Sequence, residues 1–425
     1  MMEPNRKTAF LTLLDIKKNG AYSNISLNEN IRNSGNCDPS FVRELVYGVL
    51  KNEYLLDFYL KGFVKKGFDK LGAEVLLLLR LGAYQALFMD SVPDYASVSE
   101  SVNLARKYAK GRENFINAVL RNLIRSRDDL PEVPDDDPLE YLSVKYSCKR
   151  WIAEVLTEAY GFDEAERYLE ASNRTPELSV RVNVLKTTPE ALLDELKGLG
   201  FEARKSDKTS RGIIVKGSGL IATEAFREGR FSVQDEASIM ATDVLSPEAG
   251  MDVLDMAAAP GGKTVAIAEL MGNRGKILAC DVYEHKLKLI DDAALRSGVD
   301  IINTEISDGT VFREEMERSF DRVLCDVPCS GLGVLRRKPE IKYKEAFDIK
   351  ALTDIQFRML ENSSGYLKPG GALVYSTCTV NPAENEGVTD RFLEGRTSFK
   401  KEKELHLSPL MGTDGFYMCK IIREA

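Results

Sequence analysis

Short apolar strands alternate with helices along the C-terminal half of this chain, and that alternation restricts its fold more than any other feature. Segments rich in Val, Ile, Leu and Ala predict strands, and helical spacing of apolar residues predicts helices between them. The expected strands are residues 252–256, 276–280, 301–305, 322–326 and 372–376, and the expected helices are 264–271, 284–297 and 351–366. Because parallel strands need crossover helices, residues 236–425 are predicted to form an α/β domain with a doubly wound parallel sheet.

Two further parts are predicted upstream of this domain, as expected for a chain of 425 residues. Residues 5–127 have helical apolar spacing throughout, which predicts an all-α bundle over residues 1–130. Three prolines and a run of aspartates follow at 130–138 and predict a linker. Residues 139–235 mix helix and strand patterns and predict a small α+β module.

The cysteines and histidines limit the chemistry that the chain can perform. Its seven cysteines include no Cys-x-x-Cys pair, and it has only two histidines. We therefore expect no metal site and no disulfide framework. Scarce histidine also weakens any mechanism with a Ser–His or Cys–His pair, so a nucleophilic cysteine would need another kind of activation.

Apolar runs and charge bear on the partners of the chain. No apolar run approaches the roughly 20 residues that span a bilayer, and the N-terminus lacks a secretory pattern, so we expect a cytoplasmic protein without a membrane partner. Net charge is −8, yet residues 1–130 hold 19 Lys and Arg against 15 Asp and Glu, a net of +4. This asymmetry allows a basic face for nucleic acid, and ordinary solvated helix faces are the alternative.

A glycine-rich turn joins the first predicted strand to its helix. It reads Asp255-Met256-Ala257-Ala258-Ala259-Pro260-Gly261-Gly262-Lys263-Thr264. Such a turn lets a ligand approach the backbone and the helix N-terminus. It lacks both the GxGxxG and the Walker spacing, which disfavours a nicotinamide-dependent oxidoreductase.

Acidic residues follow the next two predicted strands. Asp281 ends the second strand, where a carboxylate binds a ribose diol, and Asp308 follows the third, near an adenine edge. Together with the glycine turn, these residues predict a site for an adenosine compound such as S-adenosylmethionine. The alternative is a turn that only closes a strand–helix corner.

Two further strand ends carry cysteines in polar turns. One reads Asp326-Val327-Pro328-Cys329-Ser330-Gly331, and the other reads Ser376-Thr377-Cys378-Thr379. Because the carboxyl ends of neighbouring strands line one crevice, Cys329 and Cys378 are expected to face a common pocket. The residues alone leave open which of the two attacks a substrate. The remaining cysteines are assigned to packing: Cys37, Cys148, Cys280, Cys325 and Cys419.

These motifs resemble those of the NOP/Sun family of RNA cytosine-C5 methyltransferases. The resemblance rests on residues 258–264, 326–331 and 376–386, and on 231–238 at the entry to the catalytic domain. The helical domain resembles the NusB-like RNA-binding bundle carried by the branch that modifies small-subunit ribosomal RNA, so the likeness covers essentially the whole chain. It implies a Rossmann-like S-adenosylmethionine methyltransferase domain that acts on RNA, above all 16S ribosomal RNA. Ala257 stands where many members have cysteine.

The resemblance also implies roles for individual residues. Cys378 is the nucleophile that bonds to carbon 6 of cytosine, Cys329 assists release of the product, and Asp326 binds the base. Lys263 is a candidate to favour the thiolate or to contact the base. The predicted cofactor-binding residues are Ala257, Ala258, Ala259, Pro260, Gly261, Gly262, Lys263, Asp281, Asp308 and Asp326.

The target base must leave its stack, which is cheapest in RNA loops and bulges, and basic residues should contact the phosphates. The candidates are Arg112, Arg121, Arg125 and Arg127 near the last helix of the bundle, and Arg336, Arg337 and Lys338 after the Pro-Cys turn. The alternative for both groups is a solvated surface.

Two other functions stay open for the chain, which we expect to be a monomer. One is the same chemistry on transfer RNA, since the catalytic motifs do not separate RNA substrates. The other is a catalytically inert NusB-like assembly factor, which the intact Cys329, Cys378 and Gly261-Gly262 disfavour.

Overall fold

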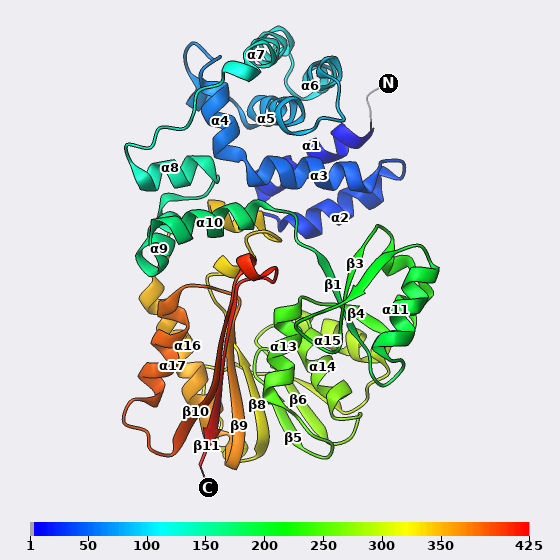
Figure 1. Cartoon of the computed structure of the whole chain (residues 1–425), viewed down its shortest axis with the longest axis vertical. Helices are drawn as coiled ribbons and strands as arrows, with labels where there is room; N and C mark the ends of the chain where they lie inside the picture. The colour runs from blue at the N-terminus through cyan, green and yellow to red at the C-terminus, as the bar shows by residue number, and fades with distance from the viewer. Residues whose placement is uncertain (1–3, 425) are drawn as a thin grey trace. The chain divides into compact units, whose positions relative to one another are not determined.

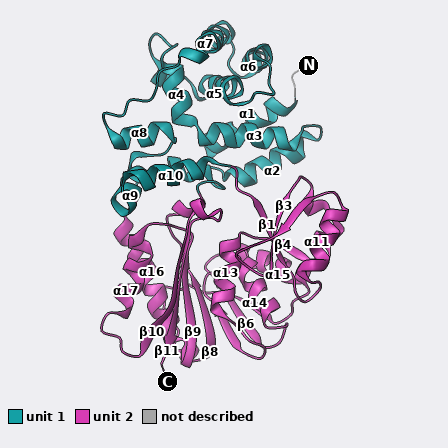
Figure 2. Ribbon diagram, in the orientation of Figure 1, with its two compact units in different colours: residues 1–174, 335–346 teal, residues 175–334, 347–425 magenta. Residues whose placement is uncertain are grey.

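The computed structural model of the protein describes residues 4–424, which form two compact units (Figure 2). Unit 1 holds the residues up to 174 together with residues 335–346. Unit 2 holds residues 175–334 and those from 347 onward. The segment 335–346, which we call the strap, therefore belongs to unit 1 although the chain on both sides of it belongs to unit 2.

Unit 1 is helical, as the apolar spacing predicted (Figure 1). Its helices are α1 (Pro4–Asn19), α2 (Ser23–Ser34), α3 (Pro39–Lys51), α4 (Glu53–Lys61), α5 (Ala73–Phe88), α6 (Asp94–Tyr108), α7 (Glu113–Arg125), α8 (Pro138–Lys145), α9 (Arg150–Tyr160) and α10 (Phe162–Asn173). One hydrophobic cluster fills the bundle of α1–α7, with Phe10, Leu45 and Leu78 fully buried in it. This burial, rather than helix propensity, supplies most of the stability of the bundle.

Two helices of unit 1 begin at an Asp-Pro pair. The Asp38 carboxylate accepts a hydrogen bond from the backbone N–H of Ser40 at 2.8 Å, and Pro39 fills the first helical position of α3. Asp137 and Pro138 start α8 in the same way. An acidic cap satisfies free N–H groups and proline has none to satisfy, so each pair fixes where its helix begins.

The strap is held in unit 1 by buried polar contacts around the 3₁₀ helix η6 (Pro339–Tyr343). The Lys342 ammonium is fully buried and donates to the carbonyl of Tyr146 at 2.9 Å and to a side-chain amide oxygen of α10. The Tyr343 hydroxyl donates to the carbonyl of Leu50. Burial lowers the pKa of Lys342 to about 7, because the charged form loses its hydration. The central part of the strap is thus buried in the folded interior of unit 1.

Unit 2 begins with an antiparallel sheet in the order β2-β3-β1-β4, which we call the small sheet. Its elements are β1 (Leu178–Val182), α11 (Pro189–Gly198), β2 (Glu202–Lys205), β3 (Gly212–Lys216), α12 (Glu224–Arg227) and β4 (Phe231–Val233). Apolar residues of α11 pack on those of β1 and β3, so the helix covers one face. Helices and strands both occur here, in agreement with the mixed pattern of the sequence, whereas helices α8–α10 of the predicted middle module lie in unit 1.

The larger sheet of unit 2 has seven strands in the order β10-β11-β9-β8-β5-β6-β7. The strands are β5 (Asp252–Asp255), β6 (Lys276–Asp281), β7 (Ile302–Ile306), β8 (Phe320–Asp326), β9 (Leu367–Thr377), β10 (Phe399–Leu407) and β11 (Phe416–Arg423). The pairs among β5, β6, β7, β8 and β9 are parallel. The strand order changes direction between β5 and β8, and ligands bind at such a switch point in doubly wound folds.

Helices cover both faces of the larger sheet (Figure 1). One face packs against α13 (Glu236–Leu245), α14 (Gly262–Leu270) and α15 (Glu284–Ser297). The other packs against α16 (Ile349–Gly365) and α17 (Glu386–Leu393). The Rossmann-like architecture predicted from the alternation of strands and helices is therefore confirmed. No helix within residues 4–424 is both long and apolar enough to cross a bilayer.

The sheet departs from the prediction at one edge, where β11 pairs antiparallel with β9 and β10 pairs antiparallel with β11. These two strands were not predicted. The charged residues of β10 suit an exposed edge strand and give no continuous apolar run, whereas β11 is largely apolar and buried, so its residues do carry a strand pattern.

Candidate active site

The glycine-rich turn lies between β5 and α14, at the switch point of the sheet. Gly261 has φ +94°, and a Cβ built on it would lie 2.9 Å from the Cα of Ile290. Glycine is required there both by the backbone conformation and by the close approach of α15. Beneath the turn, the buried Asp255 carboxylate accepts a hydrogen bond from the Thr264 hydroxyl at 2.7 Å. Burial raises the pKa of Asp255 to about 7.

A cavity of about 400 Å³ opens beside this turn. Five of the predicted cofactor residues line it, namely Ala257, Ala259, Asp281, Asp308 and Asp326. The other predicted residues of the turn, Ala258, Pro260, Gly261, Gly262 and Lys263, lie in the same segment but do not line the cavity. The carboxyl ends of the strands thus meet at one pocket, as the sequence predicted.

The lining of this cavity fits an adenosine compound with a positive sulfur. Apolar side chains that include Val282, Tyr283 and Ile355 offer walls for a flat base. Three carboxylates face the cavity and Lys286 is the one cation among its lining residues. The excess of negative charge suits ribose hydroxyls and a sulfonium, and it would repel a pyrophosphate.

Cys329 and Cys378 lie side by side, with their sulfur atoms 3.2 Å apart. Cys329 follows β8, Cys378 follows β9, and these two strands are parallel neighbours. The backbone N–H of Gly333 donates to the carbonyl of Cys378 at 3.0 Å, so the two loops are joined beyond the sulfurs as well. The two thiols therefore lie together as expected, although neither is among the residues that line the cavity beside the glycine-rich turn.

The charges around the two sulfur atoms differ. The pKa of Cys329 is raised by its contact with Cys378, by burial, and by the negative charges of Cys378 and Glu384. Cys378 instead interacts electrostatically with the Lys263 ammonium. Nearby anions disfavour a thiolate, so Cys329 is held as a thiol, whereas Cys378 lies close enough to the Lys263 cation to interact with it.

Asp326 connects the cysteine pair to the cofactor turn. One of its oxygens accepts from the Lys263 ammonium at 2.7 Å, and the other accepts from the Ser376 hydroxyl at 2.6 Å. Burial lowers the pKa of Lys263, but the Asp326 carboxylate and Cys378 raise it by more, so the net shift is upward. Lys263 therefore stays a cation beside Cys378 and Asp326.

Glu384 is a buried carboxylate that the sequence reasoning did not assign. Its Oε2 accepts from the backbone N–H of Ser330 at 2.8 Å and from the Gln356 amide at 3.0 Å. Its Oε1 accepts from Asn381 at 3.2 Å. Glu384 thus joins the loop of Cys329 to the loop of Cys378. It stands in the segment 376–386 that carries the family resemblance, but nothing in the sequence showed that it faces the other loop.

The remaining cysteines have environments unlike that of the pair. Cys148, Cys280, Cys325 and Cys419 are buried, and burial raises the pKa of each, to about 12 for the first three and about 11 for Cys419. Cys37 is half-buried in unit 1. A buried neutral thiol is a poor nucleophile, which agrees with the assignment of these residues to packing.

The predicted RNA-contacting residues all lie in unit 1. Those on or beside α7 are exposed, namely Arg112, Arg121, Arg125 and Arg127. Arg127 forms an ion pair with Asp94. In the strap, Arg336 is buried, Arg337 is half-buried and Lys338 is exposed. Within residues 4–424, no group of side chains has the arrangement of a metal site.

Three family models match the chain. The model for 16S rRNA methyltransferase RsmB/F matches residues 242–421. The NusB family model matches residues 3–125, and a model for the ferredoxin-like domain of RsmF/B-like methyltransferases matches residues 149–221. The matches follow the order of the helical bundle, the middle segment and the domain with the larger sheet.

Whole-chain similarity agrees with these matches. The chain is 36% identical over 440 residues to a probable ribosomal RNA small subunit methyltransferase B of Bacillus subtilis (strain 168), with 98% of each chain covered. The solved structure of PH0851 has a TM-score of 0.84 and 28% identity, and covers 100% of this chain and 99% of its own. A methyltransferase homolog protein from Pyrococcus horikoshii has a TM-score of 0.61 and 29% identity, covering 68% of this chain and 100% of its own.

Proposed function

Because the chain belongs to the family of 16S rRNA methyltransferases RsmB/F, we propose that it methylates carbon 5 of a cytosine in 16S ribosomal RNA through a covalent bond from Cys378. The chain is an S-adenosylmethionine-dependent RNA methyltransferase, and this cofactor supplies an electrophilic methyl group on a sulfonium. The base, the attacked carbon and the residue roles rest on the active-site geometry and on the resemblance of the motifs.

The unequal charge around two adjacent sulfur atoms is the observation that carries this proposal. The sulfurs of Cys329 and Cys378 are 3.2 Å apart, so both cannot be thiolates at the same time without strong repulsion. The cation of Lys263 acts on Cys378, whereas the carboxylate of Glu384 acts on Cys329. These contacts support Cys378 as the nucleophile, with a lysine rather than a histidine beside it.

The reaction uses covalent catalysis because carbon 5 of cytosine is a poor nucleophile. The Cys378 thiolate bonds to carbon 6, which makes carbon 5 enamine-like and able to take the methyl group. A base then takes the proton on carbon 5, the double bond between carbons 5 and 6 re-forms as the bond between carbon 6 and sulfur breaks, and the thiolate returns. Cys329 assists this release, and Asp326 holds the exocyclic amine and ring nitrogen of the base.

The same proposal assigns the cofactor and RNA contacts. Asp281 holds the ribose diol, Asp308 meets the adenine edge, and the turn 257–263 with Asp326 borders the donor. Unit 1 contributes phosphate contacts through the exposed arginines on or beside α7 and through Arg337 and Lys338 of the strap, whereas the burial of Arg336 disfavours the contact predicted for it. We propose a monomer that works in the cytoplasm, with functional boundaries near residues 130, 139 and 235.

The test incubates the purified chain with labelled S-adenosylmethionine and either 16S ribosomal RNA or transfer RNA, and then maps 5-methylcytosine. We expect Cys378→Ala to abolish transfer. We expect Cys329→Ala to accumulate a covalent protein–RNA adduct that survives a denaturing gel, because release is impaired after addition. Cys37→Ala, a half-buried thiol of unit 1, serves as the control and should do neither.

Each other outcome changes the proposal in a defined way. An adduct from Cys378→Ala and none from Cys329→Ala would reverse the roles of the two cysteines. Label in transfer RNA alone would reassign the substrate. Cofactor binding without label in any RNA would favour an inert RNA-binding assembly factor.

A further inference from the structure

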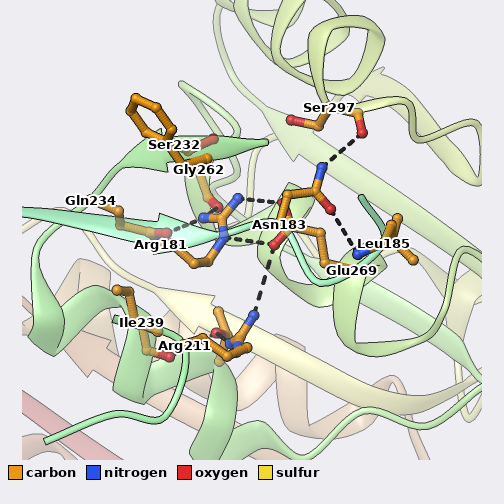
Figure 3. A network of polar contacts seen from close by, with 12 residues as sticks. Arg181, Asn183, Leu185, Arg211, Ser232, Gln234, Ile239, Gly262, Glu269 and Ser297 are labelled. Carbon is orange, nitrogen blue, oxygen red and sulfur yellow. Dashed lines mark hydrogen bonds and ion pairs between the residues drawn. The ribbon is translucent and has the colours of Figure 1, made fainter. Parts of the chain in front are cut away.

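Arg181, on strand β1 of the small sheet, is fully buried and binds two other parts of unit 2, helix α14 and the residue that follows β4 (Figure 3). Its guanidinium donates to both oxygens of Glu269, at 2.8 and 2.9 Å. It also donates to the carbonyl of Gly262 at 2.7 Å and to the side chain of Gln234. One side chain of the small sheet therefore contacts both ends of α14.

The contact with Gly262 lies at the proposed cofactor site. Gly262 is the first residue of α14, and it follows the turn that borders the cavity. The next residue is Lys263, whose ammonium binds Asp326 at 2.7 Å. The Arg181 guanidinium thus binds the Gly262 carbonyl, the peptide unit of that carbonyl leads to Lys263, and the side chain of Lys263 pairs with Asp326. A shift of the Gly262 carbonyl would thus move Lys263 relative to Asp326 and Cys378.

The energetics of a buried ion pair indicate that stability alone does not require the pair of Arg181 and Glu269. Desolvation cancels much of the attraction between Arg181 and Glu269, and a well-packed apolar pair of similar volume holds a fold equally well. A hydrophobic pair cannot, however, donate to a backbone carbonyl. The bidentate contact with Glu269 orients the guanidinium, and its remaining N–H groups reach Gly262 and Gln234.

We infer that Arg181 is a positioning residue for methyl transfer, which holds the cofactor turn and the Lys263–Asp326 pair in place through the Gly262 carbonyl. The inference rests on the proposed cofactor site and extends it. The small sheet accordingly supports the catalytic centre through this one side chain.

Arg211 provides a matched control within the same network (Figure 3). It is buried, lies immediately before β3, and approaches Glu269 at 3.8 Å while binding Asp243 at 2.5 Å. None of its hydrogen bonds goes to Gly262. Loss of Arg211 therefore perturbs the small sheet without removing the donor to the cofactor turn.

The experiment compares the full-length variants Arg181→Met/Glu269→Leu and Arg211→Met with the wild type. Unfolding in urea reports stability, calorimetry reports the dissociation constant of S-adenosylmethionine, and kinetics separate kcat from KM. We expect the double variant to fold with near wild-type stability, yet to bind the cofactor about tenfold more weakly and to show a raised KM for it. We expect Arg211→Met to lose stability but to keep the cofactor affinity.

Wild-type affinity in the double variant overturns the inference, because the role of Arg181 would then be structural. An equal loss of affinity in Arg211→Met also overturns it. If the double variant does not fold, the cofactor affinity of Arg181→Lys provides the test instead. A lysine lacks the fork that serves Glu269 and Gly262 together, so wild-type affinity there overturns the inference and weakened affinity supports it.

Asp281→Ala separates this inference from the proposed cofactor site. Unchanged affinity in Asp281→Ala and in the Arg181 variants overturns both the site and the inference. Lost affinity in Asp281→Ala with unchanged affinity in the Arg181 variants overturns only the inference.

Discussion

Replacing Glu384 by glutamine exchanges one acceptor oxygen for a donor NH₂ group where the two cysteine loops meet. The Ser330 N–H that binds Oε2 at 2.8 Å belongs to the backbone and cannot turn away, so the amide oxygen of the variant must face it. The new NH₂ group then faces the Asn381 amide, which binds Oε1 at 3.2 Å in the wild type. Asn381 cannot simply flip, because its own oxygen accepts from the backbone of Ala383 at 3.1 Å.

The magnitude follows from these contacts. One buried donor is left without a partner, which costs about 1–3 kcal/mol, and the surviving hydrogen bonds lose their charged acceptor, which costs about 1 kcal/mol more. We expect Glu384→Gln to lower the free energy of unfolding of unit 2 by about 2–4 kcal/mol. Methyl transfer should fall as well, because the loop of Cys329 loses its anchor.

Circular dichroism during urea unfolding is the suitable assay, since the single tryptophan, Trp151, lies in unit 1 and does not report on unit 2. Glu394→Gln is the matched control, because that side chain is exposed at the C-terminal end of α17. The control should change stability by less than about 0.5 kcal/mol. Equal stability of the two variants would refute the reasoning about Glu384.

Two further predictions concern the cofactor turn and the strap. Gly261→Ala should weaken S-adenosylmethionine binding by calorimetry far more than Gly262→Ala, because its Cβ would lie 2.9 Å from the Ile290 Cα at a φ of +94°, while the nearest atom to a Cβ on Gly262 is 3.6 Å away. Equal affinities would contradict this. Burial lowers the pKa of Lys342 from 10.5 to about 7, so the unfolded chain binds more protons between these values and stability rises with pH in that window. Lys342→Met should flatten that rise, as followed by Trp151 fluorescence in urea, and an unchanged slope would contradict it.

Local sequence patterns were sufficient to predict most of the fold. The apolar strands that became β5, β6, β7, β8 and β9 were predictable because a parallel sheet buries both of its faces and leaves continuous apolar runs. The edge strand β10 was not, because one side of it faces solvent and its charged residues hide the strand pattern. The strap was also not predictable, since its burial in unit 1 depends on partners far away in the sequence, such as Tyr146.

The features of the candidate site also fall into those that the sequence determines and those that depend on the tertiary structure. The sequence by itself determined which residue types stand at the strand ends: the glycine turn, Asp281 and the two cysteines, because strand ends are set by short-range patterns. Only the tertiary structure decided which of these groups meet. The 3.2 Å approach of the two sulfurs, the Glu384 carboxylate between the loops and the reach of Arg181 to the Gly262 carbonyl all join segments distant in the chain. Their roles depend on charge and distance in three dimensions, which a linear pattern does not contain.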